Sequence, residues 1–218
     1  QGYGLTETSP VLTAEAENKH KPGSIGYSLD NVEIKIDNPD KEGIGEILAK
    51  GPNIMLGYYK DEKKTKEAFK DGWFKTGDYG YIDDEGFIFI TGRKNDIIVL
   101  RNGKNVYPQE LEFLISKLPY VAECMVFARN ESNTDTAIVA KIVYNKEVME
   151  KDYPDTKKED YEKIIWKDVK EINKTLPTFK HIKKVIVTDE PMIKTTTQKV
   201  KRNEEIKKTE KELQKVGK

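Results

Sequence analysis

Cysteine and histidine are scarce in this sequence, which has one cysteine and two histidines among 218 residues. A single cysteine excludes a disulfide within the chain and suits a reducing compartment, so we expect a cytoplasmic protein. Cys124 lies inside the apolar run VAECMVFA, which is typical of a small buried residue. A cysteine nucleophile needs a base, and only His20 and His181 could supply an imidazole. Cysteine chemistry is therefore not expected.

Long apolar runs and an excess of one charge are also missing. No apolar run approaches about 18 residues, so no membrane span is predicted, although peripheral membrane contact stays open. The 38 basic and 38 acidic side chains give a formal net charge of zero. Lysine runs such as KKTEKELQKVGK contain glutamates throughout, as solvated helix faces do. We therefore expect no nucleic-acid partner.

Residues 1–92 have the pattern of short strands separated by turns. NVEIKI alternates apolar and polar residues, and GEILAKG is a second candidate strand. GYIDDEGFIFITGR predicts a hairpin that turns at 83–86. KDEKKTKEAFKDGWF predicts one short helix, with Asp61 as its N-cap and Gly72 as its stop. This region is expected to be a β-rich subdomain or partial β-barrel.

Residues 93–218 mix helices and strands. NDIIVLRNGKNV predicts two short strands around Asn102–Gly103, and YPQELEFLISKLP predicts a helix that begins with Pro108. VAECMVFA, TAIVAKIVY and IKKVIVTDE are candidate strands, and DYEKIIWKDVKEINKTLP is an amphipathic helix that ends at Pro177. The predicted fold class is α+β, with a central sheet and flanking helices in a carboxy-terminal domain of residues 93–218.

Three stretches concentrate residues that chemistry uses: GYGLTE at 2–7, GWFKTGD at 72–78, and KTTTQKVKR at 194–202. Each alone is weak evidence. A Thr-Gly-Asp turn is commonly only an Asx turn, and lysines near a carboxy end are commonly solvated.

Together with GRKNDIIVLRNGKNVYPQELE at 92–112, these stretches resemble the carboxy-terminal part of the AMP-forming adenylate enzymes, along the whole chain. The likeness extends most to bacterial long-chain fatty-acid–CoA ligases. It implies that residues 1–92 end a large AMP-binding domain and that 93–218 form a mobile domain. It also implies that Gln1 is internal to a longer protein, because the family's phosphate loop and most of its acyl pocket precede this point.

The resemblance assigns the nucleotide site to the first part of the chain. Tyr3 would lie against the adenine of ATP or AMP, with Gly2 and Gly4 allowing close approach of the backbone. Thr6 would contact the α-phosphate and Glu7 would hold Mg²⁺, which prefers carboxylate and phosphate oxygens. Asp78 would accept hydrogen bonds from the ribose hydroxyls. Arg93 would add a contact to the ribose or to a phosphate.

The resemblance also assigns residues in the second part. Lys199 would bridge the carboxylate and the α-phosphate during adenylation. Asn95 stands at the hinge about which the family rotates this domain, where Asp or Lys is common. Gly103 would line the tunnel for the pantetheine of CoA. Gln198 stands where many members have glycine, which leaves Lys194 as the alternative to Lys199.

The chain is expected to be the carboxy-terminal portion of an ATP-dependent long-chain fatty-acid–CoA ligase, whose substrates would be a carboxylic acid, ATP and CoA. Two alternatives stay open: an adenylating enzyme that loads a carrier protein, and an independent β-rich binding module. The isolated chain is expected to be inactive, and residues 1–15 to be disordered without the sheet on which they would pack.

Overall fold

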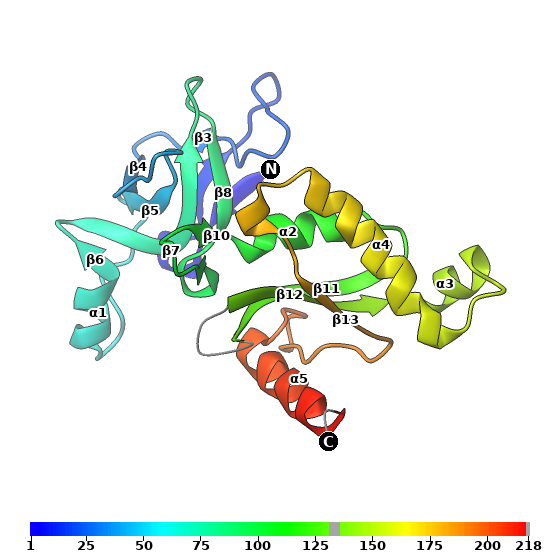
Figure 1. Cartoon of the computed structure of the whole chain (residues 1–218). Helices are drawn as coiled ribbons and strands as arrows, with labels where there is room; N and C mark the ends of the chain where they lie inside the picture. Colours follow the sequence, from blue (N-terminus) through cyan, green and yellow to red (C-terminus); the bar gives the residue numbers. More distant parts are fainter. Residues whose placement is uncertain (131–135, 217–218) are drawn as a thin grey trace. The chain divides into compact units, whose positions relative to one another are not determined.

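The computed structural model describes residues 1–130 and 136–216, which form two compact units, Gln1–Ile97 and Ile98–Lys218 (Figure 1). The sequence places the domain boundary after residue 92, whereas the compact units divide between Ile97 and Ile98. The difference arises because the one-turn 3-10 helix η2 (Lys94–Asp96) contacts strand β7 (Trp73–Ile82) of the first unit.

The first unit contains two sheets whose strand pairs are all antiparallel. One sheet has three strands: β1 (Gly2–Gly4), β2 (Val11–Ala14) and β3 (Tyr27–Ser28). The other has five: β4 (Glu33–Asp37), β5 (Gly45–Lys50), β7, β6 (Phe69–Lys70) and β8 (Ile88–Arg93), of which the last pairs with β7. Neither sheet closes on itself, so the unit is β-rich without being a closed barrel.

Local signals place two features of the first unit correctly. The predicted hairpin is confirmed by β7 and β8, and Asp83 Oδ1 accepts hydrogen bonds from the N–H groups of Glu85 and Phe87. The helix α1 (Glu62–Ala68) begins as predicted, because the Asp61 carboxylate accepts from Lys64 N. Its predicted end at Gly72 is wrong, because Phe69 and Lys70 leave the helix to pair with β7.

The expectation that residues 1–15 are disordered is not met in the structure. They form β1, the 3-10 turn η1 (Thr6–Thr8) and β2, in which Thr8, Leu12 and Thr13 are fully buried. Thr13 Oγ1 donates to Ile25 O at 2.6 Å, and Leu12 packs with Val32. This unit therefore supplies its own packing surface for the opening stretch.

The second unit is built on a three-stranded sheet in the order β11–β12–β13. β11 and β12 are antiparallel, and β12 and β13 are parallel. Figure 1 shows helices α2 and α4 on one face and α5 on the other. The elements are β9 (Ile98–Val99), β10 (Asn105–Val106), α2 (Pro108–Ile115), β11 (Val121–Asn130), β12 (Thr136–Tyr144), α3 (Lys146–Asp152), η3 (Lys158–Asp160), α4 (Tyr161–Lys174), η4 (Thr178–Lys180), β13 (Lys184–Thr188) and α5 (Arg202–Val216).

Each face of this sheet has its own core. Ile138, Ala140 and Ile142 of β12 pack toward α2 and α4, while Val139 and Val143 belong to a second cluster with Met192. A strand buried on both faces reads as a nearly continuous apolar run, as TAIVAKIVY does. Helix α3 was not predicted, and the carboxy-terminal lysine run that forms part of α5 was expected only to be a solvated helix face. Helix α5 lacked an apolar signal because its buried face includes Glu205 and Thr209.

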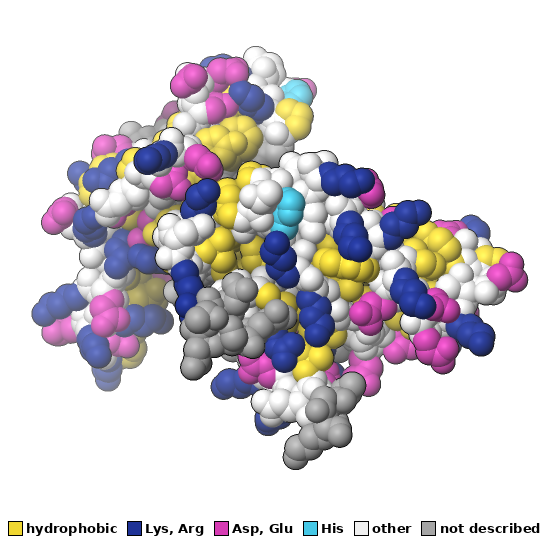
Figure 2. Space-filling view, viewed as in Figure 1, with side chains coloured by type: hydrophobic (Ala, Val, Ile, Leu, Met, Phe, Trp, Pro, Cys, Tyr) yellow, Lys and Arg dark blue, Asp and Glu magenta, His cyan; other side chains and the backbone are white. Residues whose placement is uncertain are grey.

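The surface carries charges of both signs. On the face shown in Figure 2, Lys and Arg side chains alternate with Asp and Glu side chains, and hydrophobic side chains show between them. Within residues 1–130 and 136–216, no helix combines the length and apolar character needed to cross a bilayer.

Candidate functional site

Asp78 lies in a locally distorted part of β7. The β5–β7 pairing shifts register between Glu46 and Leu48, and Gly77 on β7 has φ +74°. Thr76 Oγ1 donates to Ile47 O at 2.8 Å and accepts from Asp78 N at 3.1 Å. Such a bulge re-aims a side chain while the strand continues, so Thr76 fixes where the Asp78 carboxylate points.

Two other residues predicted to bind the nucleotide, Tyr3 and Arg93, contact this carboxylate. The Tyr3 hydroxyl donates to Asp78 Oδ2 at 2.6 Å, across 75 residues of sequence. Arg93 Nε lies 3.5 Å from Asp78 Oδ1, and Asp78 pairs with Arg93 in the β7–β8 ladder. Burial, together with the adjacent Asp78 charge, raises the pKa of Tyr3, so its hydroxyl stays a donor. The carboxylate keeps further acceptor capacity for ribose hydroxyls.

Thr6 and Glu7 lie on η1, which follows β1. The Thr8 hydroxyl fixes this turn by accepting from Leu5 N at 2.9 Å. Glu7 is half-buried, and its Oε1 accepts from the Tyr58 hydroxyl at 3.0 Å, while Thr6 is exposed. Burial and the neighbouring Glu7 carboxylate raise the pKa of Tyr58, which keeps that hydroxyl protonated.

The predicted magnesium site has one protein carboxylate. Among the described residues there is no group of three or more His, Cys, Asp and Glu side chains that could hold a metal. Magnesium usually keeps several waters and takes one or two carboxylates plus substrate phosphates. Within residues 1–130 and 136–216, the Glu7 carboxylate has one side-chain partner, the neutral Tyr58 hydroxyl. Glu7 therefore fits that pattern.

The two glycines of the opening stretch have different surroundings. A Cβ on Gly4 would lie 1.7 Å from Pro10 O, so the β1–β2 contact itself requires glycine there. A Cβ on Gly2 would lie 3.3 Å from Thr13 O, which a small adjustment could accommodate. Gly4 is therefore explained by the fold, and its approach to a nucleotide stays a prediction.

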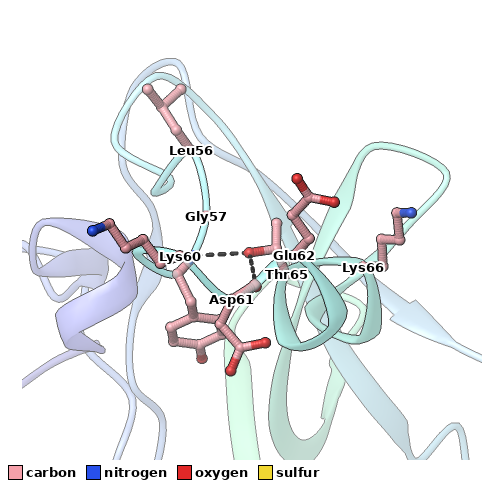
Figure 3. Close-up of a pocket in the computed structure, with 8 residues that line it drawn as sticks. Leu56, Gly57, Lys60, Asp61, Glu62, Thr65 and Lys66 are labelled. Atoms are coloured by element: carbon pink, nitrogen blue, oxygen red, sulfur yellow. Dashed lines mark hydrogen bonds between the residues drawn. The ribbon is translucent and has the colours of Figure 1, made fainter.

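A pocket with a volume of about 480 Å³ lies where α1 begins (Figure 3). Thr65 Oγ1 joins its walls, accepting from Tyr58 N and donating to Asp61 O, as the dashed lines in Figure 3 show. Tyr58 is shared between this pocket and Glu7. The lining residues are Leu56, Gly57, Tyr58, Lys60, Asp61, Glu62, Thr65 and Lys66.

Lys199 is carried by a tight hairpin in the second unit. Lys194 and Val200 pair as an antiparallel bridge, and Thr195 N donates to Lys199 O at 2.8 Å. Thr195 Oγ1 accepts from Lys199 N at 3.1 Å. Gln198 has φ +63°, the left-handed conformation that glycine adopts without strain, so the residue that departs from the family pattern occupies a glycine-like position.

The structure distinguishes the two candidate lysines. Lys194 Nζ lies 2.6 Å from Glu123 Oε1, and its side chain is half-buried. Lys199 is exposed, and no ion pair or side-chain hydrogen bond of its ammonium occurs within the described part of the chain. A cation that must reach a substrate has to be available, which favours Lys199.

Replacing Gln198 by glycine should stabilise this hairpin. Left-handed backbone costs a non-glycine residue about 1–2 kcal/mol, whereas glycine adds about 0.5–1 kcal/mol of entropic cost. We therefore expect Gln198→Gly to raise the free energy of unfolding by about 0.5–1 kcal/mol in urea denaturation. Thr197→Gly, at a neighbouring turn residue without positive φ, is the matched control and should lower it. A loss of stability in Gln198→Gly would contradict the assignment of strain.

The remaining predicted residues lie in turns. Gly103 has φ +75°, and no atom lies within 4 Å of the position of a Cβ, so the turn requires glycine and leaves open space. Asn95 is the middle residue of η2. The structure thus places Lys199 and Gly103 in the second unit, and Gly2, Tyr3, Gly4, Thr6, Glu7, Asp78, Arg93 and Asn95 in the first.

Sequence reasoning missed three residues that hold the predicted ones. Thr76 could have been found from the stretch GWFKTGD, because its hydroxyl lies two residues before Asp78 and accepts from Asp78 N. Tyr58 and Glu123 carried no such signal, because their partners lie 51 and 71 residues away along the chain (58 − 7 and 194 − 123).

Family models match both parts of the chain. A model described as AMP-binding enzyme matches residues 1–59, and one described as AMP-binding enzyme C-terminal domain matches residues 95–217. The 2-succinylbenzoate–CoA ligase of Listeria innocua is 38% identical over 205 residues, which make up 93% of this chain and 39% of that protein. The indoleacetate–CoA ligase of Aromatoleum aromaticum is 37% identical over 150 residues, covering 66% of this chain and 29% of that protein.

The chain is also similar to a solved structure. O-succinylbenzoate coenzyme A synthetase (MenE) from Bacillus subtilis, in complex with ATP and magnesium ion, matches with a TM-score of 0.75 and 31% identity. The match covers 94% of this chain and 40% of that chain, so the chain spans well under half of these relatives. The expected likeness to long-chain fatty-acid–CoA ligases is not supported, since these relatives are named for other acids.

Proposed function

Because this chain belongs to the AMP-binding enzyme family, we propose that it is the carboxy-terminal part of an ATP-dependent, AMP-forming acid–CoA ligase. The observation that carries the proposal is the group of Tyr3, Asp78 and Arg93. A buried carboxylate with free acceptor capacity, a protonated tyrosine and a guanidinium together suit a ribose and its phosphate.

The proposed reaction has two halves. A carboxylate oxygen of the acid attacks the α-phosphorus of ATP, and the bond to pyrophosphate breaks to give acyl-AMP. The thiol sulfur of CoA then attacks the acyl carbon, its proton is lost, and AMP leaves. Negative charge builds on phosphate oxygens in the first half, so that half depends on positioned cations and donors.

Five residues of the first unit have a binding role in this proposal. Asp78 accepts the ribose hydroxyls, and the Tyr3 ring, tethered through its hydroxyl, presents a face to the adenine. Arg93 adds a donor on the ribose or phosphate side. Thr6 donates its hydroxyl to the α-phosphate, and Glu7 holds Mg²⁺, which supplies charge neutralisation at the phosphates.

We propose an aromatic carboxylate, rather than a long-chain fatty acid, as the substrate class. The support is the relatives, which are named for 2-succinylbenzoate and indoleacetate. The proposed acceptor is CoA, in keeping with the names of the same relatives. The proposed site of action is the cytoplasm.

The test is pyrophosphate–ATP exchange by the full-length protein with a panel of 2-succinylbenzoate, indoleacetate, benzoate and fatty acids of several lengths. We expect exchange with an aromatic acid and formation of its CoA thioester. Exchange only with fatty acids would overturn the substrate class. Exchange with no acid would overturn the proposed function, and transfer to a phosphopantetheinyl carrier but not to CoA would overturn the acceptor.

Asp78→Asn should weaken ATP binding without unfolding the protein. A hydrogen bond to a charged group contributes about 1.5–3 kcal/mol, so we expect the KM for ATP in the exchange reaction to rise roughly 10- to 150-fold. Asp84→Asn, at an exposed turn carboxylate on the same hairpin, is the matched control and should leave the KM unchanged. An unchanged KM in Asp78→Asn would remove Asp78 from the nucleotide site.

A further inference from the structure

The hairpin that carries Lys199 is fastened by one carboxylate on the sheet. Glu123 of β11 uses both of its oxygens: Oε2 accepts from Met192 N at 3.1 Å, and Oε1 lies 2.6 Å from Lys194 Nζ. The side chain of Glu123 is only 17% exposed, so these contacts are shielded from water. Together they hold two alternate residues at the start of the hairpin.

A bulge in β11 presents Glu123 to the hairpin. The pairing with β12 shifts register between Val121 and Glu123. Beyond the bulge, Met125 and Phe127 of the same strand pack on the face that also receives Met192. Glu123 thus shares the face on which the hairpin lies, and the apolar contacts and the carboxylate act on the same segment.

A second carboxylate holds the next residue. Glu205 Oε2 accepts from Ile193 N at 2.8 Å, and its Oε1 lies 2.7 Å from the buried Lys141 Nζ. The consecutive amides of Met192 and Ile193 are therefore bound from opposite partners, β11 and α5. With its base fixed on both sides, the hairpin can hold Lys199 in a defined position.

We propose that Glu123 is a positioning residue for Lys199: it fixes the base of the hairpin and engages Lys194, so that Lys199 is the ammonium left to serve the adenylation half-reaction. This inference rests on the proposed function. Placement of a catalytic group matters strongly, since a displacement of about 1 Å can lower a rate about 100-fold. The effect should fall on acyl-AMP formation alone, because the proposed role of Lys199 is confined to that half-reaction.

The test compares three variants of the full-length protein: Glu123→Ala, Glu123→Gln and Glu190→Gln. Glu190 is the matched control, since its exposed carboxylate pairs only with Lys208 among the described residues. We expect Glu123→Ala to lower kcat for pyrophosphate exchange roughly 10- to 100-fold, with the KM for ATP and the rate of CoA acylation from preformed acyl-AMP unchanged. Glu123→Gln keeps an acceptor for Met192 N, so its kcat for pyrophosphate exchange should lie between those of Glu123→Ala and Glu190→Gln.

Hydrogen exchange gives a readout that does not depend on activity. In Glu123→Ala, the amides of residues 192–201 should exchange faster, while those of β12 stay protected. The proposal would be overturned if Glu123→Ala lowered the rates of both half-reactions equally. It would also be overturned if amide hydrogen exchange in residues 192–201 stayed as slow as in the unmutated protein. If the unmutated protein activates no acid, the proposed function fails, and hairpin protection then decides the positioning role of Glu123 by itself.

Discussion

Replacing Lys199 by alanine should lower acyl-AMP formation about 100- to 1,000-fold, measured as kcat for pyrophosphate–ATP exchange by the full-length protein. This is the loss typical of removing one group that stabilises charge developing in a transition state. The ammonium is exposed and lacks an ion pair within residues 1–130 and 136–216, so it is available for a carboxylate and a phosphate. The rate of CoA acylation from preformed acyl-AMP should not change.

Two neighbouring lysines serve as comparisons for Lys199. Lys201→Ala removes an exposed ammonium of the same hairpin that pairs with Glu204, and it should leave exchange within about twofold, as expected for a surface ion pair. Lys194→Ala should have an intermediate effect, because it loosens the contact with Glu123 without removing the reacting cation. Collapse of exchange in Lys194→Ala but not in Lys199→Ala would show that Lys194 is the catalytic lysine.

Replacing Lys141 by methionine should destabilise the protein by about 3–5 kcal/mol, measured by urea denaturation. Lys141 and Glu205 have side-chain exposures of 3% and 0%, and their Nζ and Oε1 atoms lie 2.7 Å apart. Removing one partner of a buried ion pair leaves the other charge uncompensated, which is the costly step. Glu205 would also hold Ile193 less firmly, so the loss should include protection of the hairpin base.

The matched control is Lys146→Met, at an exposed lysine that lies 3.8 Å from Glu150. An exposed pair of this kind contributes about 0–1 kcal/mol, so little change is expected. A second comparison is Lys141→Met combined with Glu205→Leu, which removes both charges and should recover part of the loss. Equal destabilisation in Lys141→Met and Lys146→Met would contradict a special role for the buried pair.

Acid should weaken the buried ion pair between Lys141 and Glu205. Burial pushes the pKa of Glu205 upward, but the Lys141 ammonium and the Ile193 N–H outweigh it and hold the pKa below its usual value of 4.5. A carboxylate with a lowered folded-state pKa stabilises the fold above its unfolded pKa, and that stabilisation is lost as the pH falls below 4.5. The difference in the free energy of unfolding between the unmutated protein and the Lys141→Met, Glu205→Leu double variant should therefore shrink below that pH.

Features set by neighbouring residues could be predicted from the sequence. Asp61 begins α1 because its side chain reaches an amide three residues on, and Asp83 fixes a hairpin turn through amides two and four residues on. The β-strands at 45–50, 121–130 and 136–144 followed from their apolar runs. Local geometry is determined by local chemistry, so these signals were sufficient.

The residues that hold the candidate site were decided by the tertiary structure. Tyr3 meets Asp78 across 75 residues, and Glu123 meets Met192 across 69. Helix α5 gave no apolar signal, because its buried face includes the charged residue Glu205. That burial is possible because Lys141, 64 residues earlier, pairs with the carboxylate. By itself, the sequence determined the α+β class, most elements and the motifs of the family. The sequence preferred Lys199 and left Lys194 as the alternative; only the tertiary structure showed that Lys194 pairs with Glu123, because a carboxylate 71 residues away along the chain (194 − 123) leaves no trace in the residues around a lysine.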